Sequence, residues 1–319
     1  MSARLSGDNN PTFMDSDLAI TFRGVRGSYP VPGTDTIRFG GNTPCIEVRA
    51  GGHLIIIDAG TGIIALGSDL VRAYFQRPAA ERGRLHLTIL LSHMHHDHIQ
   101  GYPFFAPLYL AQTTAHVLGP RMLREDLAAA LSGAMVAPYF PVDAESLACE
   151  RHIRNISEAD VVLFPSATQS LDPRVERATD ANTQDAQVVV RAYHSQNHPR
   201  GGVFCYRIEC GGKSLVYASD TEGYAGGDQR LIRFAEGADL LVHDAQYRAS
   251  EYIHGLKQGW GHSTVDMAVE VAQAANVERL ALFHHAPTND DTVVAEMERE
   301  AQAQFPSSFA AYEGLTLSL

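Results

Sequence analysis

The sequence has few cysteines, and no two of them are close together. Cys45, Cys149, Cys205 and Cys210 show no Cys-x-x-Cys spacing. A long chain with few, scattered cysteines indicates a reduced, intracellular protein whose thiols pack as small apolar side chains.

Long apolar runs are also absent. No segment approaches the ~20 apolar residues that a membrane-spanning helix needs. Residues 1–16 are polar and contain no hydrophobic stretch, so they predict a disordered tail and neither a signal peptide nor an anchor. We therefore expect a cytoplasmic protein with no membrane partner.

Positive charge is scarce. Lysine and arginine total 25 against 37 aspartate and glutamate residues, which gives a net charge of −12 with histidine neutral. Such a surface repels phosphate backbones at long range and disfavours a dedicated nucleic-acid binder. The composition otherwise is that of a globular protein, with 45% hydrophobic and 19% charged residues.

Histidine, in contrast, is concentrated at one place. Residues 93–98 read His-Met-His-His-Asp-His and follow an apolar run at 85–91 that predicts a buried strand. Imidazole and carboxylate are the ligands that zinc and similar divalent metals prefer. On a tight turn His93 and His95 can converge on one metal, while Asp97 and His98 can reach a second. The alternative is a solvated histidine-rich loop, but the spacing favours a two-metal site.

Other strands and helices are predicted by their periodicity. Residues 166–187 are polar and predict a long loop or insertion. Ser263 and Asp290 are the expected N-caps of the last two helices. The expected strands are 18–25, 54–57, 188–193, 203–209, 215–218, 238–242 and 280–283, and the expected helices run from about 62 to 75, 120–131, 265–275 and 292–303.

This pattern divides into two halves, each with strands first and helices later. Candidate ligands fall at strand ends in both halves. The arrangement predicts an α/β protein of the αβ/βα four-layer sandwich type, with two β-sheets packed face to face and helices outside. We expect residues 17–319 to form this fold as a single domain, with a metal site at the edge where strands end.

Further ligand candidates lie in the second half. His198 is in a turn between two predicted strands, and Asp220 ends a strand as Asp58 does. His284 and His285 both follow the strand at 280–283. Taken singly, each has an ordinary structural interpretation as a turn, surface or core residue.

Their order together resembles that of the metallo-β-lactamase superfamily: Asp58, the His-x-His-x-Asp-His motif at 93–98, His198, Asp220 and a final histidine. Within it, Gly-His-Ser-Thr at 261–264 and the C-terminal segment 309–314 resemble the phosphodiesterase branch. That branch contains the tRNA 3′-processing endonucleases (RNase Z) and small cyclic phosphodiesterases.

The resemblance implies two divalent metal ions, zinc first and manganese or iron as alternatives. His284 is preferred to His285 as a ligand, and Asp58 supports the histidine loop. His96 and His243 are expected to be structural. One metal is held by His93, His95 and His198, the other by Asp97, His98 and His284, and Asp220 bridges the two.

This ligand set implies hydrolysis by a metal-bound hydroxide, because two cations lower the pKa of a shared water. Asp97 can orient or deprotonate the nucleophile. His262 can stabilise the transition-state oxygen or protonate the leaving alkoxide, although a histidine beside a helix often only bonds backbone.

The leading hypothesis is a binuclear phosphodiesterase for a small or cyclic phosphodiester. The alternatives are a hydrolase of a lactam, lactone or thioester bond, and a non-catalytic binding protein on the same scaffold. The intact set of seven potential ligands argues against the last.

Two departures from RNase Z bear on partners. RNase Z enzymes carry a Gly/Pro-rich basic arm that grips tRNA, whereas acidic residues at 166–187 offset the arginines there. Together with the net charge, this predicts that tRNA is an unlikely partner and that the substrate is a small phosphodiester. A homodimer is expected from the resemblance alone. Arg23 and Arg26 either bind a substrate phosphate or are solvated arginines at a strand end.

Overall fold

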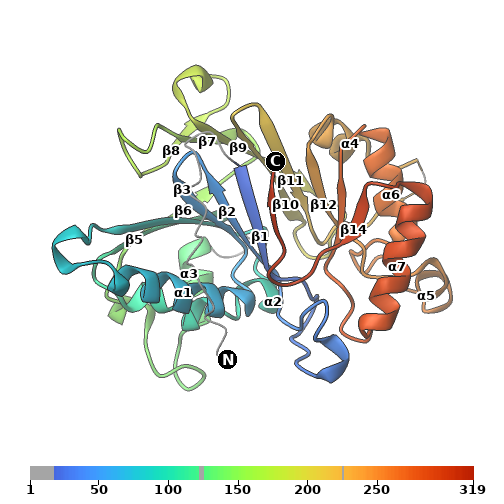
Figure 1. The fold of residues 1–319 in the computed structure, drawn as a ribbon, viewed down its shortest axis with the longest axis horizontal. Coiled ribbons are helices and arrows are strands. Elements are labelled where there is room, and N and C mark those ends of the chain that lie inside the picture. The colour runs from blue at the N-terminus through green and yellow to red at the C-terminus, as the bar shows by residue number, and fades with distance from the viewer. Residues whose placement is uncertain (1–17, 122–125, 225) are drawn as a thin grey trace, which may run out of the picture.

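The computed structural model describes residues 18–121, 126–224 and 226–319, so the tail predicted for residues 1–16 lies outside it. Two β-sheets face each other across the middle of the molecule, and helices cover their outer sides (Figure 1). This is the predicted αβ/βα sandwich. No helix in the described ranges is long and apolar enough to span a membrane.

The first sheet comes mainly from the N-terminal half, and its strand order is β15-β1-β2-β3-β4-β5-β6. The C-terminal strand β15 lies at one edge of this sheet and pairs with β1. The bounds are β1 (Leu18–Gly24), β2 (Cys45–Ala50), β3 (His53–Ile57), β4 (Leu85–Leu90), β5 (Thr113–Pro120), β6 (Glu150–Ile156) and β15 (Thr316–Ser318).

The second sheet has the order β14-β13-β12-β11-β10-β9-β7-β8. Its bounds are β7 (Asp160–Phe164), β8 (Arg174–Arg177), β9 (Val188–Ser195), β10 (Val203–Cys210), β11 (Lys213–Ala218), β12 (Leu240–Asp244), β13 (Leu280–Phe283) and β14 (Ser308–Ala310).

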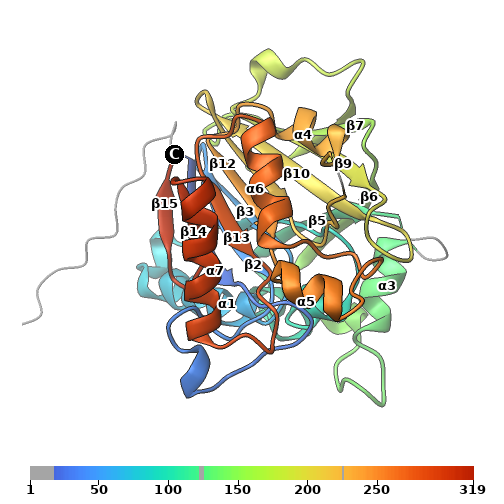
Figure 2. The ribbon, with the colours of Figure 1, turned by 90° about the vertical axis from the view of Figure 1, so that its right-hand side faces the viewer.

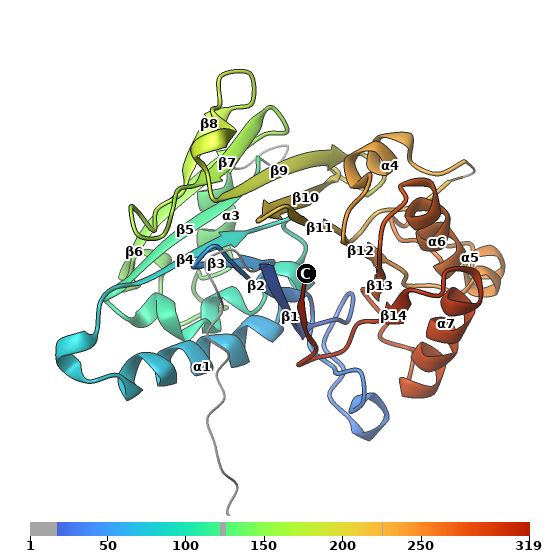
Figure 3. The ribbon, with the colours of Figure 1, turned by 45° about the horizontal axis from the view of Figure 1, so that its top comes forward.

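Helices close the two outer layers. α1 and α3 pack on the first sheet, while α4, α6 and α7 cover the second, as Figures 2 and 3 show from two sides. The main core lies between the sheets and is made of inward-facing side chains such as Phe22, Ile57, Tyr206 and Phe283. The helices are α1 (Gly62–Gln76), α2 (His96–Ile99), α3 (Leu127–Gly133), α4 (Gln229–Ala235), α5 (Ala249–His254), α6 (Val265–Ala274) and α7 (Asp291–Gln304).

Parallel pairing brings the predicted strand ends together. Strands β3 to β6 run parallel to one another, and so do β11 to β14. Because parallel strands end at the same edge of a sheet, the loops that follow them are neighbours. The histidine motif follows β4, as predicted, and the other candidate ligands follow β9, β11 and β13.

Three sequence predictions are wrong in detail. Of the helix expected at 120–131, residues 122–125 lie outside the described residues; α3 begins at Leu127, and Pro120 belongs to β5 along its partner β6. The loop expected at 166–187 contains strand β8, which pairs with β7. Thr264, not Ser263, caps α6, because the Ser263 hydroxyl donates to the carbonyl oxygen of Thr221 instead. The predicted Asp290 cap of α7 is confirmed.

Candidate metal centre

Three residues at strand ends share an unusual backbone conformation. Asp58 after β3, Asp220 after β11 and His284 after β13 have φ values of 60°, 56° and 61°. A left-handed conformation outside glycine costs on the order of 1 kcal/mol or more and persists only where surrounding contacts fix it. All three side chains are buried in the polar cluster described next.

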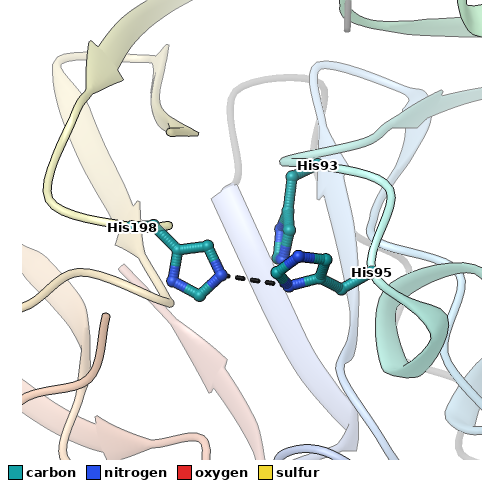
Figure 4. A group of neighbouring side chains, drawn as sticks. All are labelled: His93, His95 and His198. Carbon is teal, nitrogen blue, oxygen red and sulfur yellow. Dashed lines mark hydrogen bonds between the residues drawn. The ribbon is translucent and has the colours of Figure 1, made fainter. Parts of the chain in front are cut away.

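The first part of this cluster consists of three imidazoles. His93, His95 and His198 point toward one another from the loops after β4 and β9 (Figure 4), and their ligand nitrogens lie within 4.8 Å of one another. His198 Nε2 is 3.0 Å from His95 Nδ1. His198 Nδ1 donates to the carbonyl oxygen of Gly261 at 3.1 Å, which leaves the lone pair on Nε2.

The second part contains two carboxylates and two imidazoles, all buried: Asp97, His98, Asp220 and His284. Asp220 Oδ2 lies 3.1 Å from His98 Nε2 and 3.3 Å from His284 Nε2. Its other oxygen, Oδ1, is 3.9 Å from Nε2 of both His93 and His198. Asp220 therefore stands between the two groups, with one oxygen toward each.

Asp58 supports this arrangement from behind. Its Oδ2 accepts hydrogen bonds from His98 Nδ1 at 2.7 Å and from the Tyr217 hydroxyl at 2.7 Å, and its Oδ1 accepts from the backbone of Ser92 at 2.7 Å. The bond to Nδ1 orients the His98 ring, so that its Nε2 faces Asp220. This is the supporting role that the sequence resemblance implied.

The donor set fits divalent metal ions. The Nε2 atoms of His93 and His98 are buried and have no hydrogen-bond partner. Burial, and then the neighbouring His98, lower the pKa of His93 well below its usual value, so its imidazole is neutral. A buried neutral imidazole nitrogen without a partner is the donor that first-row divalent metals take, and carboxylates complete the set.

His262 joins the same cluster through a residue that the sequence analysis missed. Its Nδ1 lies 2.8 Å from Asp244 Oδ2, and its ring stacks on that of His284 with centroids 4.9 Å apart. Burial alone would lower the pKa of His262, but Asp244 and then Asp220 raise it to about 9. Asp244 is the last residue of β12. The strand predicted from the sequence ended at residue 242, so Asp244 was not recognised as a strand-end carboxylate.

The remaining histidines lie elsewhere. His285 Nε2 donates to the carbonyl oxygen of Ala311 at 2.9 Å, so the structure brings His284, and not its neighbour, into the cluster. His243 is buried with Nδ1 on the carbonyl oxygen of Asp244, and His96 is exposed at the start of α2.

The structure contradicts both expectations for Arg26, and those for Arg23 stay predictions. Arg26 has no exposed surface and donates to three backbone carbonyl oxygens, so it is neither solvated nor free to bind a phosphate. Arg23 is paired with Glu47 and Asp69. Both arginines are occupied in holding the β1 end in place.

Known proteins share this architecture. A family model described as "Beta-lactamase superfamily domain" matches residues 53–285. The chain belongs to the metallo-β-lactamase superfamily. It is a metal-dependent hydrolase, as the resemblance predicted.

Relatives and solved structures agree with this assignment. Ribonuclease Z of Metallosphaera sedula is 29% identical over 240 residues, covering 69% of this chain and 77% of the relative. The metallo-β-lactamase fold protein YhfI from Bacillus subtilis superposes with a TM-score of 0.62 at 19% identity, covering 95% of this chain and 100% of its own. Human tRNase Z, short form, gives 0.59 at 18% identity, covering 94% and 98%.

These relatives correct one prediction. The expectation that tRNA is an unlikely partner is wrong, because several relatives carry the name Ribonuclease Z. Net charge describes the whole surface and does not determine the charge near one cleft. The acidic composition of residues 166–187 shows only that this segment is not a basic arm.

Proposed function

We propose that the protein is a binuclear metal-dependent phosphodiesterase. The observation that carries the proposal is the position of Asp220, whose two oxygens face two separate groups of ligand atoms. A carboxylate placed between two sets of donors suits a pair of divalent ions a few ångströms apart, with zinc first and manganese or iron as alternatives.

We propose the division of ligands that the sequence resemblance implies. His93, His95 and His198 would hold one ion, Asp97, His98 and His284 the other, and Asp220 both. Two divalent ions bound there supply an activated water and neutralise charge on a phosphoryl group during in-line displacement.

Asp97 is oriented from two sides. The backbone N–H of Ser28 donates to Asp97 Oδ2 at 2.7 Å, and His284 Nε2 lies 3.2 Å from the same oxygen. These contacts fix the carboxylate within the second ligand group. We assign it the orientation and deprotonation of that nucleophile.

His262 is the proposed general acid. Its Nδ1 is held by Asp244, so Nε2 is the nitrogen left to donate a proton. A cationic imidazole can stabilise a developing oxyanion and then protonate the departing alkoxide as the P–O bond breaks. The Gly-His-Ser-Thr segment that resembles the phosphodiesterase branch supplies this histidine, and the relatives named Ribonuclease Z support the same chemistry.

The test is a substrate panel on protein stripped of metal and reloaded separately with zinc and manganese. It contains a precursor tRNA with a 3′ trailer, cyclic nucleotides, bis(p-nitrophenyl) phosphate, a lactam, a lactone and a thioester. We expect hydrolysis of phosphodiesters, and the panel shows whether RNA or a small or cyclic ester is preferred.

His95→Ala should abolish this activity, whereas its exposed neighbour His96→Ala, outside both ligand groups, is the matched control. Turnover of the lactam, lactone or thioester with no phosphodiester cleaved would overturn the proposal.

A further inference from the structure

A cavity of about 550 Å³ adjoins the metal centre on the side of His198. His198 directs Nε2 toward His95, and residues 196–199 of the same loop form one wall of the cavity. The loop after β11 and the segment after α5 form the other walls. The lining residues are 196–199, 222–224, 252, 258, 259 and 267.

The cavity offers no free charge. Its described lining contains no lysine or arginine, and Glu222 is its one carboxylate. His198 also lines the cavity, but its Nε2 faces His95. Both oxygens of Glu222 are occupied. Oε1 accepts from the Tyr252 hydroxyl at 2.6 Å and the Gly259 backbone at 2.7 Å, and Oε2 accepts from the Gly261 backbone at 2.7 Å. With no cation present, the cavity does not suit a phosphate group.

What the cavity does offer is neutral and planar. Tyr224 is 51% exposed at its rim, and the side chain of Gln258 is also exposed. Within the described part of the chain, neither the Tyr224 hydroxyl nor the Gln258 amide has a hydrogen-bond partner. The Met267 thioether adds a polarisable surface. An aromatic face together with an amide that both donates and accepts is the combination that recognises an unpaired nucleobase.

We propose that this cavity binds the nucleobase of a nucleotide next to the scissile phosphate, with Tyr224 stacking on the base and Gln258 bonding its edge. The inference rests on the proposed phosphodiesterase function and names the substrate as a nucleotide ester. Of the parts of a nucleotide, the base is the planar, uncharged one, which matches the cavity, while the anionic phosphate matches the metal centre.

The chain carries its own reporter for this binding. Trp260 is the single tryptophan of the sequence, is 55% exposed and follows directly after the lining residue Gly259. The Lys257 ammonium lies 3.9 Å from its ring centroid. We expect a ligand bound beside Gly259 to change the fluorescence of this indole.

The experiment titrates zinc-loaded protein with AMP, UMP and ribose 5-phosphate and follows tryptophan fluorescence. We expect both nucleotides to bind at least tenfold more tightly than ribose 5-phosphate, and Tyr224→Leu or Gln258→Leu to remove most of this preference. Tyr139→Leu is the matched control, because Tyr139 is 87% exposed and does not line the cavity. Equal affinities for AMP and ribose 5-phosphate, or a Tyr224→Leu protein that behaves as wild type, would overturn the inference.

A kinetic arm separates this inference from the proposed function. Thymidine 5′-(p-nitrophenyl phosphate) and methyl p-nitrophenyl phosphate share a leaving group, but only the first carries a base. We expect Tyr224→Leu to lower the ratio of their kcat/KM values about tenfold. Hydrolysis with an unchanged ratio supports the phosphodiesterase and rejects the base site. Base-dependent binding without hydrolysis of either ester supports the site and rejects the phosphodiesterase.

Discussion

The carboxylate of Asp244 holds His262 by its Nδ1 atom at a distance of 2.8 Å, and both side chains are buried. Asp244 also accepts from the backbone N–H groups of Asp220 at 3.1 Å and Ser263 at 2.9 Å. One carboxylate therefore links the proposed general acid to the residue that stands between the two ligand groups.

Replacement of His262 should separate chemistry from metal binding. We expect His262→Ala to lower kcat by roughly a hundredfold or more on alkyl phosphodiesters, with little change in metal content. The loss should shrink for p-nitrophenyl esters, because that leaving group departs without a proton. Equal losses on both kinds of ester would argue against general-acid catalysis.

Asp244→Asn tests the same proton-transfer step through the carboxylate that holds His262. The amide is nearly isosteric but removes the negative charge that raises the pKa of His262. Because less His262 is then protonated near neutral pH, the alkaline limb of the pH–rate profile should move to lower pH. An unchanged alkaline limb in steady-state kinetics would show that His262 is not the group that titrates there.

Asp220→Ala should lower the occupancy of both metals, because its two oxygens face both ligand groups. The expected value for the unmodified protein is about two metals per chain, measured by elemental analysis after dialysis. Two metals retained in the variant would remove Asp220 from the bridging position.

The adjacent histidines should behave differently. His284→Ala loses one metal and most activity, whereas His285→Ala keeps the metals, because its ring bonds the Ala311 carbonyl. His285→Ala should instead lower the free energy of unfolding by roughly 1–3 kcal/mol, the range for a buried partner left unsatisfied. Paired metal and urea-unfolding measurements check both statements, and the reverse result would exchange the roles.

Arg26 should matter for stability and not for substrate. Arg26→Met leaves two buried carbonyl oxygens and one part-buried carbonyl oxygen without their donor, so we expect the free energy of unfolding to fall by roughly 3 kcal/mol. Arg72→Met is the comparison, since its ion pair with Asp69 is exposed and contributes about 1 kcal/mol or less. A higher KM for Arg26→Met, with the free energy of unfolding unchanged, would instead indicate that Arg26 binds a substrate phosphate.

His53 should make stability depend on pH. Its Nε2 donates to the carbonyl oxygen of Pro165 at 2.7 Å, and burial lowers its pKa below the ordinary value. Above about pH 6.5 both the folded and unfolded forms are neutral, so this residue makes no difference. As the pH falls below that value, the unfolded chain takes up a proton that the folded chain does not, and stability is lost by at most about 1.4 kcal/mol per pH unit.

Urea unfolding at pH 7.5, 6.5 and 5.5 measures this contribution. His53→Gln keeps a donor at this position but does not titrate, so its stability should fall less steeply over the same interval. Equal slopes for the two proteins would mean that other groups carry the dependence.

The sequence predicts best what is local. The motif at 93–98 and the strand before it are contiguous, so spacing alone indicated these candidate metal ligands. His198 and Asp220 came only from their order along the chain, since a single histidine or aspartate at a strand end is ambiguous. The structure adds the distances that bring them together.

The features that were missed depend on contacts distant in the sequence. Arg26 is buried by carbonyl oxygens about 260 residues further along the chain, which no local pattern reveals. The cavity beside His198 is likewise lined by segments distant in sequence, and Glu222 accepts there from the backbone at 259 and 261. Strand β8 was missed because its polar residues pair with only one neighbouring strand, β7, at the edge of the sheet.

The pairing of β15 with β1 has a consequence for the connectivity of the molecule. The backbone N–H of Leu319 donates to the carbonyl oxygen of Leu18 at 3.0 Å, so the two ends of the described fold touch. A short linker would join them into a ring without disturbing either sheet. New ends could then be opened in the turn between β7 and β8, far in sequence from every proposed ligand. A circularly permuted chain would therefore keep the same fold and the same ligand residues, while the order of those residues along the chain would change.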